Sequence, residues 1–148
     1  MSQLDGFFSL RTPADLLEKL EHDFVRLSNS DQHSPAAQYA AFDFFVCAEH
    51  LADWKKNAVG GTIGQHRAYP DGALVSHIAN GAKHFRVDPQ RHSAAKDTIV
   101  VAGAFGAGFQ RSAFQSSQLV IELENGSSAP VAEVAARVLA HWKRETPR

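Results

Sequence analysis

Cysteine is nearly absent from this chain of 148 residues, which contains a single one, Cys47. One thiol excludes an internal disulfide and cannot build a cysteine-based zinc site. Because Cys47 lies inside an apolar run, the sequence predicts a buried, unreactive thiol rather than a catalytic nucleophile. The sequence also holds no signature that requires a cofactor, and we expect none.

Long hydrophobic runs are missing too. No apolar stretch approaches the roughly 18 residues that a membrane span needs, so no membrane partner is expected. The N-terminus has no basic region followed by an apolar core, and Asp5 falls early, which predicts that there is no signal peptide. These features favour a cytoplasmic protein with one domain over residues 1–148, a length that can bury a proper core.

An excess of positive charge is absent, since the net charge is −1. This balance gives no overall basic surface for nucleic acid and leaves only a local patch for that role. Familiar catalytic motifs are absent as well. There is no HExxH, ExxH or HxH pattern for a metal, no GxxxxGK or GxGxxG loop for phosphates, and no GxSxG elbow of a serine hydrolase. Function has to be inferred from clusters of polar side chains.

What the sequence does contain is a series of helix signals. Thr12-Pro13 and Ser34-Pro35 each pair an N-cap residue with a proline at the first helical position. Apolar residues then recur at spacings of three and four, as on one face of a helix. Four helices are expected, over residues 13–28, 35–56, 71–85 and 130–145.

The segments between these helices give different signals. The glycine-rich residues 57–72 predict a loop. Two β-branched segments, at residues 98–101 and 119–123, predict strands that pair as a hairpin. The expected fold class is therefore mainly α, a four-helix bundle with a small β-hairpin inserted before the C-terminal helix.

Two of the predicted helices carry polar side chains beside their apolar faces. Polar residues at spacings of three and four form a stripe along each helix. If the two helices are neighbours in the bundle, the stripes converge on one polar site. The candidate site residues are His50 and Asp53 from the helix at 35–56, and His77, Asn80, Lys83 and His84 from the helix at 71–85, with Asp43 and Glu49 near them on the first helix.

Three interpretations of this polar site are open. Histidine and carboxylate at helical spacing can act as general acid and base on a nucleic acid or a nucleotide. The same residue types can bind zinc, manganese or iron in the core of a bundle. Alternatively, they form a hydrogen-bonded network that fixes the helix register of a non-enzymatic module, one that binds a protein partner or forms a homodimer.

Two stretches of the chain resemble known proteins. Residues 41–54 (AFDFFVCAEHLADW) and 76–85 (SHIANGAKHF) look like a family of small bacterial helical proteins to which no activity is assigned. More distantly, a helix bearing Asn80-x-x-Lys83-His84 resembles the HEPN helical-bundle superfamily. Many members of that superfamily are ribonucleases or nucleotide-binding partners in toxin–antitoxin and phage-defence systems.

The resemblance implies a helical bundle that acts on or binds RNA or a nucleotide. Active HEPN members carry Arg-x(4–6)-His, and Asn80 stands here where that arginine is expected. In a nuclease of this kind His84 would be the acid–base group, Asn80 and Lys83 would hold the phosphate, and no metal would be needed.

Overall fold

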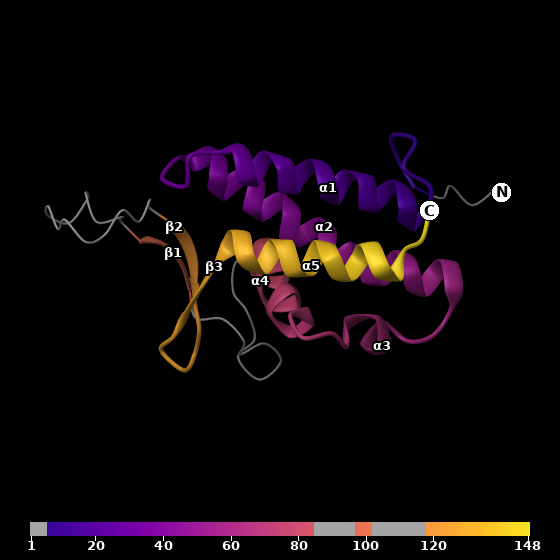
Figure 1. The fold of residues 1–148 in the computed structure, drawn as a ribbon. Helices are drawn as coiled ribbons and strands as arrows, with labels where there is room; N and C mark the ends of the chain where they lie inside the picture. The colour runs from indigo at the N-terminus through magenta and orange to yellow at the C-terminus, as the bar shows by residue number, and fades with distance from the viewer. Residues whose placement is uncertain (1–5, 85–96, 102–117) are drawn as a thin grey trace, which may run out of the picture.

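The computed structural model describes residues 6–84 and 118–148 in full and residues 97–101 by their backbone. The chain is mainly helical, with a small antiparallel sheet before the C-terminal helix, as the sequence predicts (Figure 1). In chain order the elements are α1 (Pro13–Asn29), α2 (Pro35–Val59), α3 (Ile63–Arg67), α4 (Gly72–His84), β1 (Asp97–Val101), β2 (Gln118–Glu122), β3 (Ser128–Pro130) and α5 (Val131–Glu145).

Helices α1 and α2 begin where the sequence places their caps. The Asp15 carboxylate accepts a hydrogen bond from the Thr12 N–H at 2.8 Å, and the Thr12 hydroxyl accepts one from the Asp15 N–H. The Ser34 hydroxyl caps α2 by accepting a hydrogen bond from the Ala37 N–H, without a reciprocal bond. Caps of this type stabilise a helix by about 1 kcal/mol. None of the helices in the described part of the chain combines the length and the hydropathy that crossing a membrane requires.

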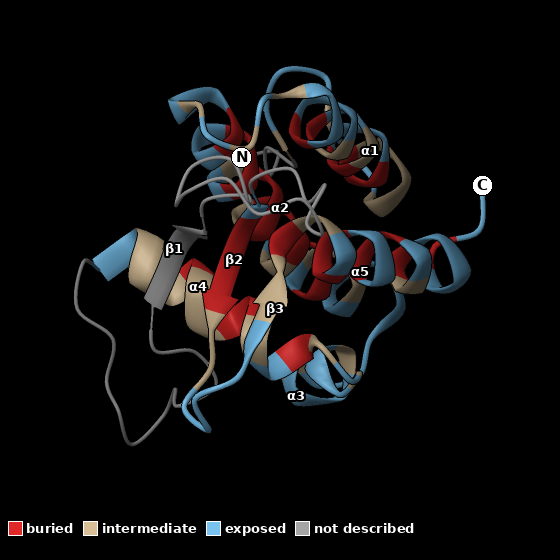
Figure 2. Cartoon of the chain, turned by 60° about the vertical axis from the view of Figure 1, so that its left-hand side comes forward, coloured by how far each residue is buried: buried red, intermediate tan, exposed pale blue. Residues whose placement is uncertain are grey.

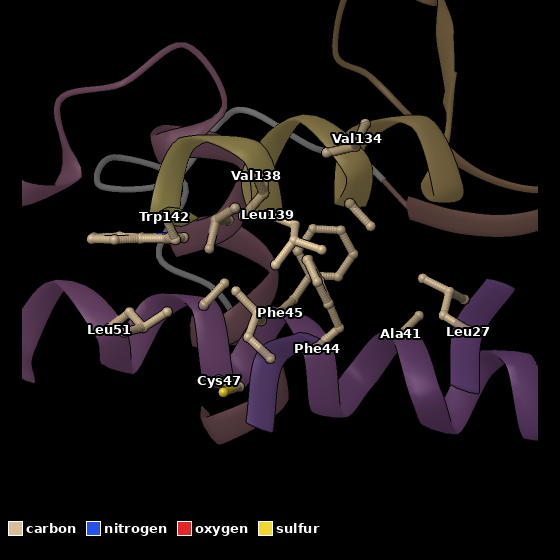
Figure 3. Close-up of a cluster of buried hydrophobic side chains, with 14 of the residues drawn as sticks. Leu27, Ala41, Phe44, Phe45, Cys47, Leu51, Val134, Val138, Leu139 and Trp142 are labelled. Atoms are coloured by element: carbon tan, nitrogen blue, oxygen red, sulfur yellow. The ribbon is translucent and has the colours of Figure 1, made fainter. Parts of the chain in front are cut away.

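The hydrophobic core lies between α1, α2 and α5. Phe44 and Phe45 of α2 face α5, and their rings pack edge to face with centroids 5.4 Å apart (Figure 3). Buried residues occupy the inward sides of these helices and exposed residues their outward sides (Figure 2). Cys47 belongs to the same core, and burial raises the pKa of its thiol to about 12. The predicted burial of this thiol is therefore confirmed, and the raised pKa is consistent with the predicted low reactivity.

The sheet is built around β2, which pairs antiparallel with both β1 and β3. Ile99 lies opposite Val120 in one ladder, and Val120 lies opposite Pro130 in the other. The predicted hairpin is confirmed, with a third strand that the sequence did not indicate. Leu119, Val120 and Ile121 are all buried although consecutive side chains point to opposite faces, so both faces of β2 are covered.

Residues 57–72 contain a short helix where the sequence predicts only a loop. A reciprocal cap forms it, because Gln65 Oε1 accepts from the Thr62 N–H at 2.9 Å while the Thr62 hydroxyl accepts from the Gln65 N–H. The segment ends at Gly72, where an added Cβ would lie 1.9 Å from the Arg67 carbonyl oxygen. Only glycine fits there without a backbone shift, since the end of α3 passes directly over the start of α4.

Candidate functional site

A cleft of about 620 Å³ lies between α2 and α4 and opens to solvent. Ligand pockets in proteins commonly have volumes of about 300–1,000 Å³, so this cleft suits a small molecule or one unit of a polymer. One wall comes from α2 and the other from α4, with a single contribution from α3. The lining residues are Phe42, Val46, Glu49, His50 and Asp53 of α2, Arg67 of α3, and Ser76, Ala79, Asn80, Ala82, Lys83 and His84 of α4.

Glu49 joins the three helices that form the cleft. Its carboxylate accepts a hydrogen bond from the Ser76 hydroxyl of α4 at 2.8 Å and forms an ion pair with the Arg67 guanidinium of α3. The Glu49 side chain is only 16% exposed. A carboxylate withdrawn from water needs such partners, because its desolvation is costly. Glu49 therefore holds α3 and α4 against α2.

The other ionisable groups of the cleft face solvent. His50 and Asp53 are exposed on α2, and Lys83 and His84 are exposed in the last turn of α4. Asn80 is half-buried beside them. Together they supply two imidazoles that can accept or donate a proton, an ammonium group for an anion, a carboxylate and an amide. The cleft therefore has the groups for ligand binding and for proton transfer.

The structure brings five of the six predicted site residues to this cleft, and His77 is the exception. The side of α4 that faces α2 carries Ser76, Ala79, Asn80 and Lys83. His77 follows Ser76 by one residue, which turns it about 100° around the helix axis. It is half-buried and lies outside the lining of the cleft. His77 therefore lies apart from the other five, and the catalytic role of all six residues stays a prediction.

Asp43 also lies elsewhere than the sequence suggested. Its carboxylate pairs with Arg26 of α1 at 3.1 Å. Arg26 contacts a second carboxylate as well, that of Asp23, which is 2% exposed and also pairs with Lys19 at 2.6 Å. Of these ion pairs, Arg26–Asp43 connects α1 to α2, and the two pairs of Asp23 lie within α1. None of them involves a residue that lines the cleft between α2 and α4.

The segment between α3 and α4 is fixed to α5. Tyr69 stacks on His141 with ring centroids 4.0 Å apart, and Asp71 accepts two hydrogen bonds from Arg137 at 2.9 and 3.1 Å. Burial raises the pKa of the Tyr69 hydroxyl and lowers the pKa of His141, so both rings favour their neutral forms. These contacts hold in place the short chain that carries Arg67 into the cleft.

Half of the twelve lining residues were not selected by sequence reasoning, namely Phe42, Val46, Arg67, Ser76, Ala79 and Ala82. Ser76 and Ala79 are small residues at a spacing of three on α4, a signal that could have identified the side facing α2. Phe42 lies within an apolar run, which predicts that it is buried in the core, yet its side chain is 52% exposed. Arg67 carries no local signal, because its position depends on how the whole of residues 60–72 folds.

A metal site gains no support from the described residues. In residues 6–84 and 118–148, no three histidine, cysteine, aspartate or glutamate side chains gather closely enough to hold a metal ion. Comparison with known proteins gives no match, since no family model, no curated protein and no solved structure is significantly similar to the chain. Function therefore has to be inferred from the chemistry of the cleft.

Proposed function

We propose that the cleft between α2 and α4 binds a nucleotide, either free or as one unit of an RNA strand, in a cytoplasmic HEPN-like four-helix bundle. One observation carries the proposal: a single solvent-open cleft combines a lysine, an arginine, two histidines, two carboxylates, an amide and an exposed phenyl ring. A nucleotide consists of a phosphate, a ribose and a base, and the cleft offers a complementary group to each.

Different side chains of the cleft contact the phosphate, the ribose and the base of the nucleotide. Lys83 holds the phosphate through a charge-assisted hydrogen bond, and the imidazole of His84 donates a second hydrogen bond to it. Asp53 accepts hydrogen bonds from the ribose hydroxyls, a role that carboxylates take in dinucleotide-binding proteins. The exposed ring of Phe42 stacks on the base, and the amide of Asn80 both donates to and accepts from the edge of the base.

The charges of the cleft permit an anion despite its two carboxylates. Arg67 neutralises Glu49, so this pair contributes no net charge. Lys83 balances Asp53, and the two histidines add positive charge whenever they are protonated. Lys83 and His84 also stand in the last turn of α4, where cations offset the negative end of the helix dipole.

Metal-independent cleavage of RNA is a second candidate function, because two imidazoles line the same cleft as Lys83. In this reaction His84 accepts the proton of a ribose 2′-hydroxyl, the 2′-oxygen attacks phosphorus, and the bond from phosphorus to the 5′-oxygen breaks. His50 donates a proton to the departing 5′-oxygen, and Lys83 stabilises the charge on the phosphoryl oxygens. The products are a 2′,3′-cyclic phosphate and a 5′-hydroxyl.

Calorimetric titration with nucleoside monophosphates and short single-stranded RNA tests the binding. We expect saturable binding that Lys83→Ala weakens about tenfold or more, the loss typical of a charged hydrogen bond. Lys56→Ala is the matched control, because Lys56 is an exposed lysine in the last turn of α2 outside the cleft. Absence of binding, or an equal loss in both variants, contradicts the proposal.

Incubation of the protein with labelled RNA in EDTA tests the cleavage. We expect His84→Ala and His50→Ala to abolish it, whereas His22→Ala, on the exposed side of α1, leaves it unchanged. RNA that stays intact with the unaltered protein rejects cleavage and leaves the cleft a binding site. If the protein neither binds nor cleaves, the polar groups are structural and the interaction-module interpretation takes precedence.

A further inference from the structure

A second cleft, also of about 620 Å³, adjoins the first along α2. Phe42 lines both clefts, so its ring forms a wall that they share. Tyr39, one turn earlier on α2, lines only the second cleft. Tyr39 is 66% exposed and Phe42 is 52% exposed. Residues three apart lie on the same side of a helix and about 4.5 Å apart along its axis, so two accessible aromatic rings stand next to each other.

The chemistry of the second cleft differs from that of the first. None of its described lining residues is basic, and its carboxylate, Asp43, already pairs with Arg26. Ile78 and several other apolar side chains form most of its walls, while Gln38 contributes an amide. The cleft therefore offers a stacking surface and hydrogen bonds but no charged partner for a phosphate. A nucleobase satisfies these conditions, because it has two apolar faces and a polar edge.

We propose that the second cleft is a subsite for a second base, which stacks on Tyr39 next to the nucleotide in the first cleft. This proposal rests on nucleotide binding in the first cleft and defines its substrate class. The ligand is a unit of two unpaired nucleotides in single-stranded RNA. A duplex does not fit, because its bases stack on one another and pair along their edges, so they cannot stack on protein rings.

The affinities for 5′-adenosine monophosphate and for the 5′-phosphorylated diadenylate pApA, measured by calorimetry, test this proposal. Stacking of one further base should make pApA bind about tenfold more tightly than the mononucleotide. Tyr39→Ala should remove this gain and leave the affinity for the mononucleotide unchanged, whereas Tyr39→Trp should keep the gain. Val25→Ala, which removes a side chain that is 53% exposed on α1, is the control and should change neither affinity.

Each other outcome has a distinct meaning. If the mononucleotide binds and pApA binds no more tightly, the second subsite is wrong and the first cleft keeps its function. A gain that survives in Tyr39→Ala places the second base elsewhere and overturns the proposal. If neither ligand binds, nucleotide binding itself has failed. Sedimentation experiments distinguish a further case. If the unaltered protein is a dimer and the Tyr39→Ala variant is a monomer, the second cleft is instead an interface between two copies of the chain.

Discussion

The two sides of α2 differ in what they bury. On the side that faces α1 and α5, Phe44, Phe45 and Leu51 are each at most 2% exposed. On the side that faces α4, Phe42 and His50 are exposed and line the polar cleft. One helix therefore supplies both the centre of the hydrophobic core and one wall of the candidate site.

This difference teaches that the core and the proposed ligand site depend on different sides of a single helix. The core side stabilises the fold through apolar burial, about 1.5–3 kcal/mol for each large side chain. On the cleft side, Glu49 makes the partly buried contacts to Ser76 and Arg67, and the exposed polar groups are left for a ligand. Substitutions on one side should therefore leave the property of the other side nearly unchanged.

Truncation of two phenylalanines that stand two residues apart on α2 is the strongest test of this comparison. Phe44→Ala should lower the free energy of unfolding by about 3–5 kcal/mol, because it leaves a cavity in the core. Phe42→Ala should lower it by less than about 1 kcal/mol, since the ring is half in solvent. Urea denaturation measures both. Similar losses in the two variants would show that the two sides are not distinct.

A methyl group added at Gly72 should have the next largest effect. Its Cβ would lie 1.9 Å from the Arg67 carbonyl oxygen, so Gly72→Ala should force a backbone shift that costs about 1–3 kcal/mol. Because that shift displaces Arg67, it should also lower the affinity of the cleft for any ligand. Gly64→Ala is the control, since its Cβ would meet only Thr62 Oγ1 at 3.8 Å. In that variant the higher helix propensity of alanine should maintain or raise the stability.

Acidification should destabilise the contact between Tyr69 and α5, with a smaller effect than the substitution of Gly72. Burial lowers the pKa of His141 below its usual value of 6.5, so the folded state binds a proton less readily than the unfolded chain. The stability that the neutral His141 contributes is fully present above pH 6.5 and is lost as the pH falls from 6.5 through the lower pKa of the folded state. His141→Gln should flatten the dependence of the melting temperature on pH in this range. His22→Gln, on the exposed side of α1, should leave the dependence unchanged.

The exposed histidines of the cleft should have the smallest effect on stability. His50→Ala and His84→Ala should each change the free energy of unfolding by no more than about 0.5 kcal/mol, as is usual for exposed side chains. Thermal melts of the two variants without ligand measure this. A loss of more than 1 kcal/mol in either variant would mean that the histidine supports the fold and would weaken its assignment to ligand binding.

The helices were predictable from the sequence because their signals are local. Thr12 and Ser34 mark the starts of α1 and α2, and the glycine at position 60 ends α2 with a φ of +83°. The short helix α3 was missed although its cap is also local, since Thr62 and Gln65 have the spacing of a capping box. That pattern was masked by the surrounding glycines, which predict a loop.

The cleft was only partly predictable, because a helical wheel gives relative directions and not the direction of the neighbouring helix. The wheel grouped His77 with Asn80, but the hydrogen bond between Ser76 and Glu49 turns the adjacent stripe of α4 towards α2. Arg67 reaches the cleft from a separate segment, so no periodicity could identify it. Tertiary contacts therefore decide which polar residues meet.

The burial of Cys47 has a practical consequence for observing this molecule. Its Sγ lies 3.6 Å from the Leu16 carbonyl oxygen of α1, and its raised pKa leaves almost no thiolate at neutral pH. An alkylating reagent can therefore react only with those molecules in which α1 has separated from α2. The rate of alkylation of Cys47, followed by mass spectrometry, therefore reports how often the core of the protein opens. A ligand that binds only the folded chain should lower this alkylation rate as the ligand concentration rises, even if the ligand does not contact the thiol.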